Sequence, residues 1–210
     1  MAIDQQRHRR LRLLTRELNK QRRKQARQID ILCNDFIAAQ RDFINKLNAI
    51  GFASHFYESI IGVTDLNSLL YAAVRFIKEQ LDDANVTFFL RQADNFELHI
   101  FENDKAISIE EQHLENCFGP ELMDSICRSN KVCTLDDMFA MGLQGNVVGL
   151  KRVSAVTIPL GRLGSSLGFI LIHRSSQNKI AADQLSNICA VASGLSRAIQ
   201  SCRKLLHQAD

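Results

Sequence analysis

The sequence contains no tryptophan, only two prolines, and no apolar run of the length that a transmembrane helix needs, about 20 residues. Its first ten residues lack the apolar core of a secretory signal. None of its six cysteines stands in a Cys-x-x-Cys pair, the spacing typical of zinc and dithiol motifs. These absences favour a cytoplasmic protein whose thiols stay reduced and serve as small apolar side chains.

Proline and glycine are absent from the whole stretch between Gln5 and Asn48. The residues in that stretch are mostly Arg, Lys, Gln, Leu, Ala and Ile, which favour a helix. At about 1.5 Å per residue such a helix would be roughly 60 Å long, more than one small domain can cover. The sequence therefore predicts a long helix over residues 1–50 and a separate domain over residues 51–210, with a break at Gly51.

Acidic residues are scarce at the start of the chain. Residues 1–28 hold ten Lys or Arg against two acidic residues, a balance of +8, whereas the remaining residues hold sixteen basic against twenty-one acidic residues, a balance of −5. If the helix forms, we expect the basic residues to spread around its circumference. The predicted basic surface consists of Arg9, Arg12, Arg16, Arg22, Arg23, Lys24 and Arg27.

This basic surface suits a protein partner, a phosphate backbone or an anionic membrane. No helix-turn-helix is visible and no aromatic residue lies among the basic ones, so sequence-specific reading of bases is not supported. The remaining alternative is a solvated extension that keeps the protein soluble.

Apolar residues in the second half of the predicted helix recur at helical spacing and form a wide face. One set comprises Ile29, Leu32, Phe36, Ala39, Phe43 and Ile50, and a second set beside it comprises Cys33, Ile37, Ile44 and Leu47. A face this wide suits packing against several helices, as in a bundle, better than a lone two-stranded coiled coil.

The last quarter of the chain predicts a strand, a turn, a second strand and a helix. Apolar residues alternate from Val153 to Leu160, and the segment from Leu167 to His173 is apolar at nearly every position, as expected of a central strand covered on both faces. Beyond Lys179 an apolar residue recurs every three or four positions. This a/d seam predicts a long amphipathic helix.

Between the first helix and this last quarter, the chain predicts a capped helix, a hairpin and an irregular region. The expected elements are a helix capped by Asp65 that extends to Leu81, a hairpin from Val86 to Phe101, a short helix at Pro120 to Ser129 and a short strand at Lys131 to Leu135. The region from Glu102 to Arg152 is the least regular, and long irregular segments are often binding loops.

The order and spacing of these elements, with Ser154–Leu160, Gly168–Ile172 and a last helix that contains Asp183 and Ala198-Ile199, resemble a GAF domain over about residues 51–207. The resemblance implies an α+β fold with a central antiparallel sheet of five or six strands, the terminal helices packed on one face and a small-molecule pocket on the other. It also implies a parallel homodimer in which the first helix, as a coiled coil, and the last helix form a bundle. The implied interface contains Ile29, Leu32, Phe36, Phe43, Leu185, Ile188, Leu195 and Ile199.

Three kinds of chemistry known among GAF domains find little support in the sequence. Cyclic-nucleotide binders carry Asn-Lys followed by Phe and an acidic pair, but after Asn178-Lys179 this chain lacks both. Bilin-binding domains attach the chromophore to a Cys usually followed by His, whereas Phe118 follows Cys117. The catalytic Cys of free methionine-R-sulfoxide reductase has no counterpart in residues 147–152, so we expect no enzyme.

Histidines offer little sign of a metal or haem site. His99, His113 and His173 do not pair with another ligand at metal spacing, and we interpret them as strand-end or surface residues. The cofactor, if any, stays unknown.

The remaining candidates for a ligand pocket fill a core equally well. They are Phe89, Leu98, Cys117, Phe118, Phe139, Met141, Ala155 and Thr157. The sequence predicts a non-enzymatic sensory or regulatory protein that couples a small-molecule or redox signal to a partner. The alternative is a dimeric scaffold with an empty pocket that docks into a larger assembly through its first helix.

Overall fold

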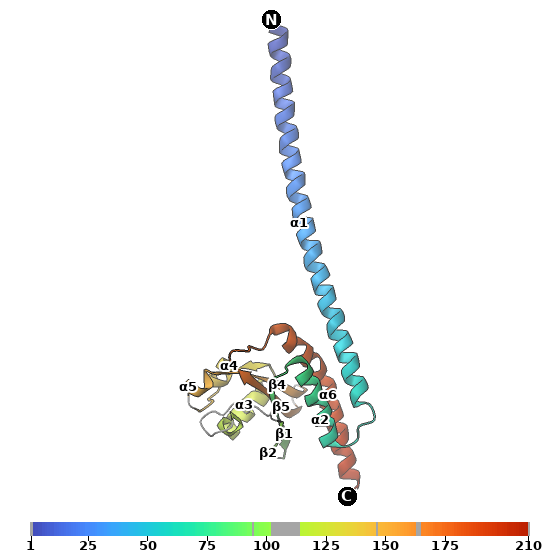
Figure 1. Ribbon diagram of the computed structural model, residues 1–210, viewed down its shortest axis with the longest axis vertical. Helices are drawn as coiled ribbons and strands as arrows, with labels where there is room; N and C mark the ends of the chain where they lie inside the picture. The colour runs from blue at the N-terminus through green and yellow to red at the C-terminus, as the bar shows by residue number, and fades with distance from the viewer. Residues whose placement is uncertain (1, 94, 102–113, 146, 163–164, 210) are drawn as a thin grey trace. The chain divides into compact units, whose positions relative to one another are not determined.

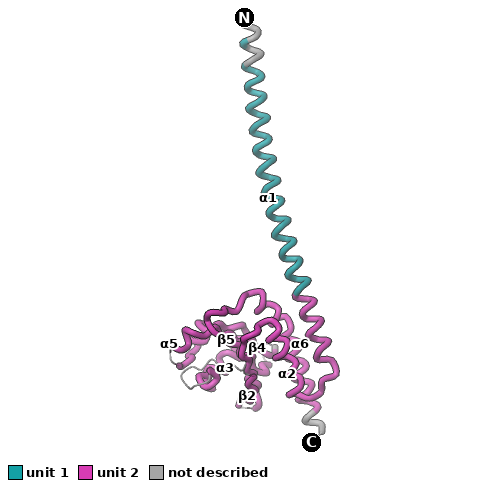
Figure 2. The backbone as a smooth tube through the Cα atoms, viewed as in Figure 1, with its two compact units in different colours: residues 1–48 teal, residues 49–210 magenta. Residues whose placement is uncertain are grey.

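A computed structural model describes residues 2–93, 95–101, 114–145, 147–162 and 165–209 of the chain. The protein divides into two compact units, residues 1–48 and residues 49–210, which Figure 2 colours separately. Helix α1 (Ala2–Ile60) runs without an internal break and supplies the described part of the first unit. No helix in the described ranges combines the length and the hydropathy needed to span a bilayer.

The second unit contains a sheet with helices on both of its faces (Figure 1). Its elements after α1 are α2 (Leu66–Gln80), β1 (Asn85–Gln92), β2 (Asn95–Phe101), η1 (Leu114–Cys117), α3 (Pro120–Ser129), β3 (Cys133–Thr134), α4 (Leu135–Ala140), α5 (Val147–Leu150), β4 (Val153–Arg162), β5 (Ser165–Ser175) and α6 (Ala182–Ala209). This α+β arrangement, preceded by a long helix, confirms the fold class expected from the sequence.

The described strands form one antiparallel sheet of five, in the order β2-β1-β5-β4-β3. Strand β5 lies at its centre and pairs with β1 on one side and β4 on the other. Gly168 adopts a φ of +130°, and a Cβ atom placed there would lie 1.8 Å from the carbonyl oxygen of Phe89. Glycine therefore allows β5 to approach β1 closely at this point.

One face of the sheet is covered by α2, α6 and the end of α1. Phe56 on α1 is 1% exposed, and its ring meets Phe76 of α2 edge-on at a centroid distance of 5.4 Å. On α6, a Cβ atom at Gly194 would lie 2.1 Å from Cε1 of Tyr57, so glycine makes room for the tyrosine ring. The terminal helices thus pack on one face, as predicted.

The opposite face of the sheet is covered by the short helices of the irregular region. Its buried core joins Phe89, Leu171 and Ala155 of the strands to Leu122 of α3 and Met138 of α4. The two faces alternate along each strand, so β1 and β5 contribute side chains to both cores.

Three details of the sequence prediction need correction. Helix α1 does not break at Gly51, because the following turns bury Phe56 in the core and outweigh the roughly 1 kcal/mol that a helical glycine costs. The short strand is limited to Cys133–Thr134, since Thr134 caps a helix that starts at Leu135. That helix and α5 were not predicted, because four to six residues show too little periodicity.

Candidate functional site

A buried polar cluster lies on the sheet face opposite the terminal helices. Glu115 projects from η1, and one of its oxygens, Oε1, accepts a hydrogen bond of 2.7 Å from the Thr87 hydroxyl on β1. The same oxygen lies 3.2 Å from Nε2 of His173 on β5. The His173 and Glu115 side chains are 6% and 3% exposed. This cluster joins the first short helix of the irregular region to two central strands.

Glu115 is ionised despite its burial. Burial raises the pKa of this carboxyl, but the hydrogen bonds from His173 and Thr87 outweigh that effect and lower the pKa to about 2. An ionised carboxylate only accepts hydrogen bonds, so Nε2 of His173 carries the hydrogen in this contact. The Glu115 carboxylate therefore carries a negative charge inside the domain near neutral pH.

Two buried polar atoms beside this cluster have no hydrogen-bond partner among the described residues. They are Nδ1 of His173 and Oγ1 of Thr157. In the sheet register, Thr87 and Thr157 both lie opposite Leu171, on its two sides, so both threonines share the face of His173. Buried polar atoms are usually paired, so these two are the atoms of this face that a bound water or small polar ligand would pair with.

Aromatic rings fill the neighbouring part of this face. The rings of Phe89 and Phe169 stack at a centroid distance of 4.6 Å, and Phe118 lies 5.2 Å from Phe89. All three side chains are at most 6% exposed. This end of the face is therefore packed core, and the polar end is the part that offers unpaired groups.

Most of the predicted pocket residues gather on this face. Phe89, Phe118 and Ala155 belong to its buried core, Cys117, Phe139 and Met141 pack against that core, and Thr157 is fully buried. Leu98 also lies on this face, because it pairs with Phe89 in the sheet, but it belongs to the edge strand β2 and is 43% exposed. Ligand binding by these residues stays a prediction.

The sequence missed the Glu115–His173 pair. His173 lies near the end of β5, as expected of a strand-end histidine, but it is 5% exposed and not on the surface. His173 follows Leu171 by two residues and Phe169 by four. Because alternate residues of a strand point to the same face, this spacing indicates that all three side chains share one face of the sheet. Glu115 sat in a region without periodicity, and His113 lies outside the described residues.

Two cysteines of this region, Cys117 and Cys127, are poor nucleophiles. Burial raises the pKa of the Cys117 thiol, and the charge of Glu115 raises it further. Burial also raises the pKa of Cys127. Since the thiolate is the reactive form, these shifts weaken the redox version of the sensory hypothesis. The described residues form no cluster of His, Cys, Asp and Glu that could hold a metal ion.

The predicted dimer interface has one half on α1 and one half on α6, and the two halves differ in solvent exposure. On α1, Ile29, Leu32, Phe36 and Phe43 are 59–70% exposed. On α6, Ile188, Leu195 and Ile199 are at most 1% exposed and Leu185 is partly buried, all within the core of their own domain. The assignment of Ile188, Leu195 and Ile199 to a dimer interface is therefore wrong, because the sheet and α2 already cover them.

The outward side of α6 is polar and small instead. Among its exposed residues are Asp183, Ser186, Ala190, Ser193, Arg197, Ser201 and Lys204. Leu205 near its end adds one large apolar side chain, which is 49% exposed.

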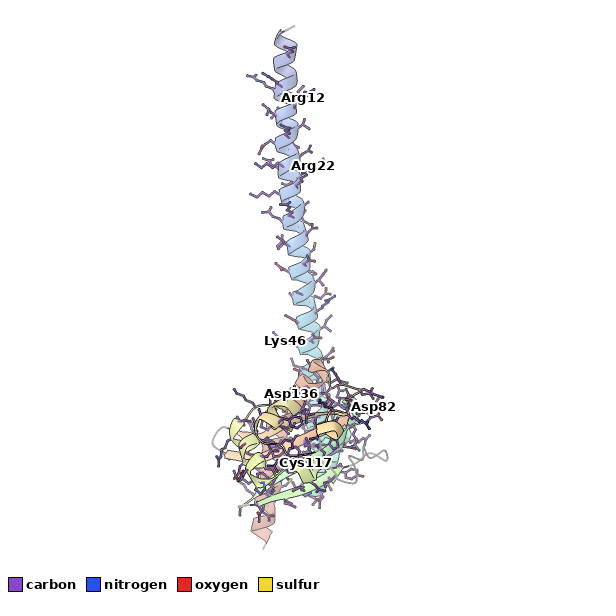
Figure 3. The ribbon with its side chains drawn as sticks, turned by 90° about the vertical axis from the view of Figure 1, so that its left-hand side faces the viewer. Arg12, Arg22, Lys46, Asp82, Cys117 and Asp136 are labelled. Atoms are coloured by element: carbon purple, nitrogen blue, oxygen red, sulfur yellow. The ribbon has the colours of Figure 1, made fainter. Side chains whose placement is uncertain are left out.

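The residues of the predicted basic surface are all exposed on α1, and Figure 3 shows Arg12 and Arg22 projecting from the helix. The expectation that they spread around the helix is only partly right. Because α1 is continuous, steps of three and four residues place one subset on a single face. We call Arg9, Arg12, Arg16, Lys20, Arg23 and Arg27 the basic stripe. Arg22 and Lys24 lie on other faces.

Comparisons with solved structures reveal the fold family. One similar structure is that of a GAF domain/HD domain protein from Geobacter sulfurreducens, with 12% identity, coverage of 68% of this chain and 97% of that chain, and a TM-score of 0.53. Another is the GAF domain of a phosphoenolpyruvate-protein phosphotransferase from Coxiella burnetii, with 13% identity, coverage of 77% and 98%, and a TM-score of 0.54. The chain contains a GAF-like fold. The corresponding phosphotransferase GAF domain from Acinetobacter agrees, with 9% identity, coverage of 76% and 97%, and a TM-score of 0.53.

The sequence itself matches no family model and no curated protein. The likeness is therefore one of backbone arrangement, at identities too low to transfer a ligand. The Thr87–Glu115–His173 cluster is observed in this chain itself and is not inferred from the similar structures.

Proposed function

We propose that this protein is a non-enzymatic sensory or regulatory GAF protein of the cytoplasm, which acts as a parallel homodimer through α1. A small polar molecule that binds beside the Thr87–Glu115–His173 cluster would be its signal. The signal would reach a partner through the terminal helices. The dimer would keep the exposed apolar face of α1 out of water.

One observation supports this proposal most strongly. Strands β1 and β5 contact the polar cluster on one face of the sheet and the terminal helices on the other. Thr87 and His173 meet the polar cluster, while their neighbours Val86, Phe88 and Ile172 belong to the core under α2, α6 and the end of α1. A ligand that shifts β1 or β5 by a few tenths of an ångström changes the packing of both cores, since close-packed interiors transmit such strain. The site and the output helices are thus mechanically connected.

The apolar face of α1 supports the dimer. Steps of four and three residues connect Ile29, Cys33, Phe36, Gln40, Phe43 and Leu47, which we call the α1 seam. Its large apolar members are 50–70% exposed in the single chain. A contiguous apolar face of this kind marks an interaction site, and a heptad seam with one polar position suits a second copy of the same helix.

Thermal melting against a panel of small polar molecules tests the sensory part. The panel includes nucleotides, amino acids and small carboxylates, with wild type and the variants Thr157→Val and His173→Gln run in parallel. A true ligand raises the melting temperature of wild type and raises that of the variants less, because it binds only the folded state. Equal shifts in wild type and variants would place the ligand elsewhere.

A second candidate function is a dimeric scaffold. The packed rings of Phe89, Phe118 and Phe169 favour it because they fill part of the ligand face. In that case the polar cluster holds only water. The same panel then produces no shift with any compound, while the dimer persists in light scattering.

A further inference from the structure

The basic stripe of α1 has no role in the proposed dimer or in the proposed sensory site. Its six members follow one another in steps of three, four, four, three and four residues. At about 1.5 Å per residue, the stripe extends for roughly 27 Å along the helix. Asp30 follows Arg27 after three residues and ends the stripe with a negative charge. The result is a bounded, straight, one-signed surface on one face of a helix.

We infer that the basic stripe binds the phosphodiester backbone of a nucleic acid without reading its sequence. Five of its six members are arginines, whose planar guanidinium forks match phosphate oxygens. A stripe of roughly 27 Å has the length of about eight base pairs of a duplex, since phosphates of each strand are spaced about 3.4 Å apart along the axis. This inference supplies the partner class left open in the proposed function, but it requires only one copy of α1.

The composition of the stripe argues against a protein partner. Protein interfaces are usually anchored by aromatic or aliphatic side chains in a dry centre. Residues 1–28 contain no phenylalanine, tyrosine or tryptophan, and the six members of the stripe are all charged. Leu13 also lies on this face and is 64% exposed, but a single leucine among six charged side chains does not form a dry centre. Phosphate backbones are bound by surfaces of this composition.

The position of three of the four leucines in residues 1–28 argues against a membrane. Leu11, Leu14 and Leu18 form their own short row at steps of three and four residues and are 56–62% exposed. This row lies about 160–200° around the helix from the basic stripe, because Leu14 and Leu18 each stand two residues from Arg16. A helix that inserted these leucines into a bilayer would point the stripe away from the lipid phosphates.

Fluorescence anisotropy with a labelled 20-base-pair duplex of arbitrary sequence tests this inference on the full-length protein. Duplex DNA and duplex RNA are measured separately at several salt concentrations. The stripe variant replaces Arg12, Arg16 and Arg23 by Gln. The matched control replaces Arg10, Arg22 and Lys24, which lie off the stripe, by Gln and removes the same three charges. Circular dichroism checks that α1 remains helical in both.

We expect wild type to bind at least one of the two duplexes with an affinity that falls steeply with salt. Loss of three phosphate contacts should lower the slope of log K against log salt by about 2 to 3 and weaken binding at least tenfold at about 0.1 M salt. The control variant should lose less than threefold. Two unrelated duplex sequences should bind equally well.

Three results would overturn the inference. They are no binding to either duplex at low salt, equal losses in the stripe variant and the control, and tighter binding to anionic vesicles than to nucleic acid. Light scattering on the same samples reports the dimer separately. A monomer that still binds nucleic acid would refute the proposed dimer and leave the stripe intact.

Discussion

Helices α1 and α6 both carry apolar residues at steps of three and four, but the structure uses the two seams in different ways. The α6 seam consists of Leu185, Ile188, Ala192, Leu195, Ile199 and Cys202. It packs against the sheet and α2 of its own domain, with Leu195 1% exposed. The α1 seam leaves Phe36 70% exposed. The difference shows that a heptad pattern identifies the apolar face of a helix and does not say what covers that face. Stability should depend on one seam and association on the other.

The largest effect should come from charges placed in the α1 seam. Phe36→Asp combined with Phe43→Asp should turn the proposed dimer into a monomer. The dissociation constant should rise about 1,000-fold if each of the two Phe–Phe pairs across the interface contributes roughly 2 kcal/mol. The matched control is Asn34→Asp with Ala38→Asp, which adds the same charges on the other side of the helix. Light scattering over a concentration series measures both. Dimers in both variants would remove the α1 seam from the interface.

Truncation in the α6 seam should cost stability and leave association unchanged. Leu195→Ala opens a cavity in the core and should lower the free energy of unfolding by about 3 kcal/mol. For a chain of this size, we expect the melting temperature to fall by about 6–12 °C. A variant that stays folded but becomes monomeric would mean that α6 also takes part in the interface.

Gly194→Ala tests the contact between α6 and the end of α1. The added methyl group would lie 2.1 Å from the Tyr57 ring, so overpacking should cost about 2 kcal/mol in chemical denaturation. Replacing Tyr57 by Leu in the same chain removes the clash and should recover most of that loss. No interaction energy in the double-mutant cycle would show that the two helices do not meet at this point.

The smallest effect concerns the polar cluster and its dependence on pH. The pKa of Glu115 is lowered to about 2 from the ordinary value of 4.5, so its ionised form stabilises the folded state. That stabilisation is complete above about pH 4.5 and is lost as the pH falls toward about 2. Glu115→Gln should cost about 1 kcal/mol at pH 7 and flatten the stability curve in this acid range. Parallel curves for wild type and variant between pH 4.5 and 2 would contradict the assignment.

The sequence predicted the elements with strong periodicity and failed where periodicity is short or ambiguous. The alternation in β4, the apolar run of β5 and the cap at Asp65 all gave correct elements. Helices α4 and α5 are too short to show a period, and the continuation of α1 beyond Gly51 depends on tertiary packing of Phe52, Phe56 and Ile60.

The candidate site was only partly predictable for a related reason. Phe89, Phe118 and Ala155 follow from apolar patterns on strands and a short helix. The partnership of Glu115 with His173 joins residues 58 positions apart, and no local pattern encodes such a contact. The α6 seam failed as an interface because an apolar stripe looks the same in sequence whether its own domain or a second copy covers it.

Oxidative cross-linking through Cys33 tests the α1 dimer most directly. Cys33 is exposed and occupies a seam position, so a parallel, in-register pair places it opposite its counterpart on the second copy. Disulfide formation requires the two Cα atoms to lie within about 7 Å. We predict that mild oxidation converts the wild-type chain into a covalent dimer in which the Cys33–Cys33 bond is identified by mass spectrometry, and that Cys33→Ser abolishes it. In an antiparallel pair that overlaps the whole seam, the two thiols would be separated by roughly 15–20 Å along the helices. A dimer in solution that never forms the Cys33–Cys33 bond would contradict the account.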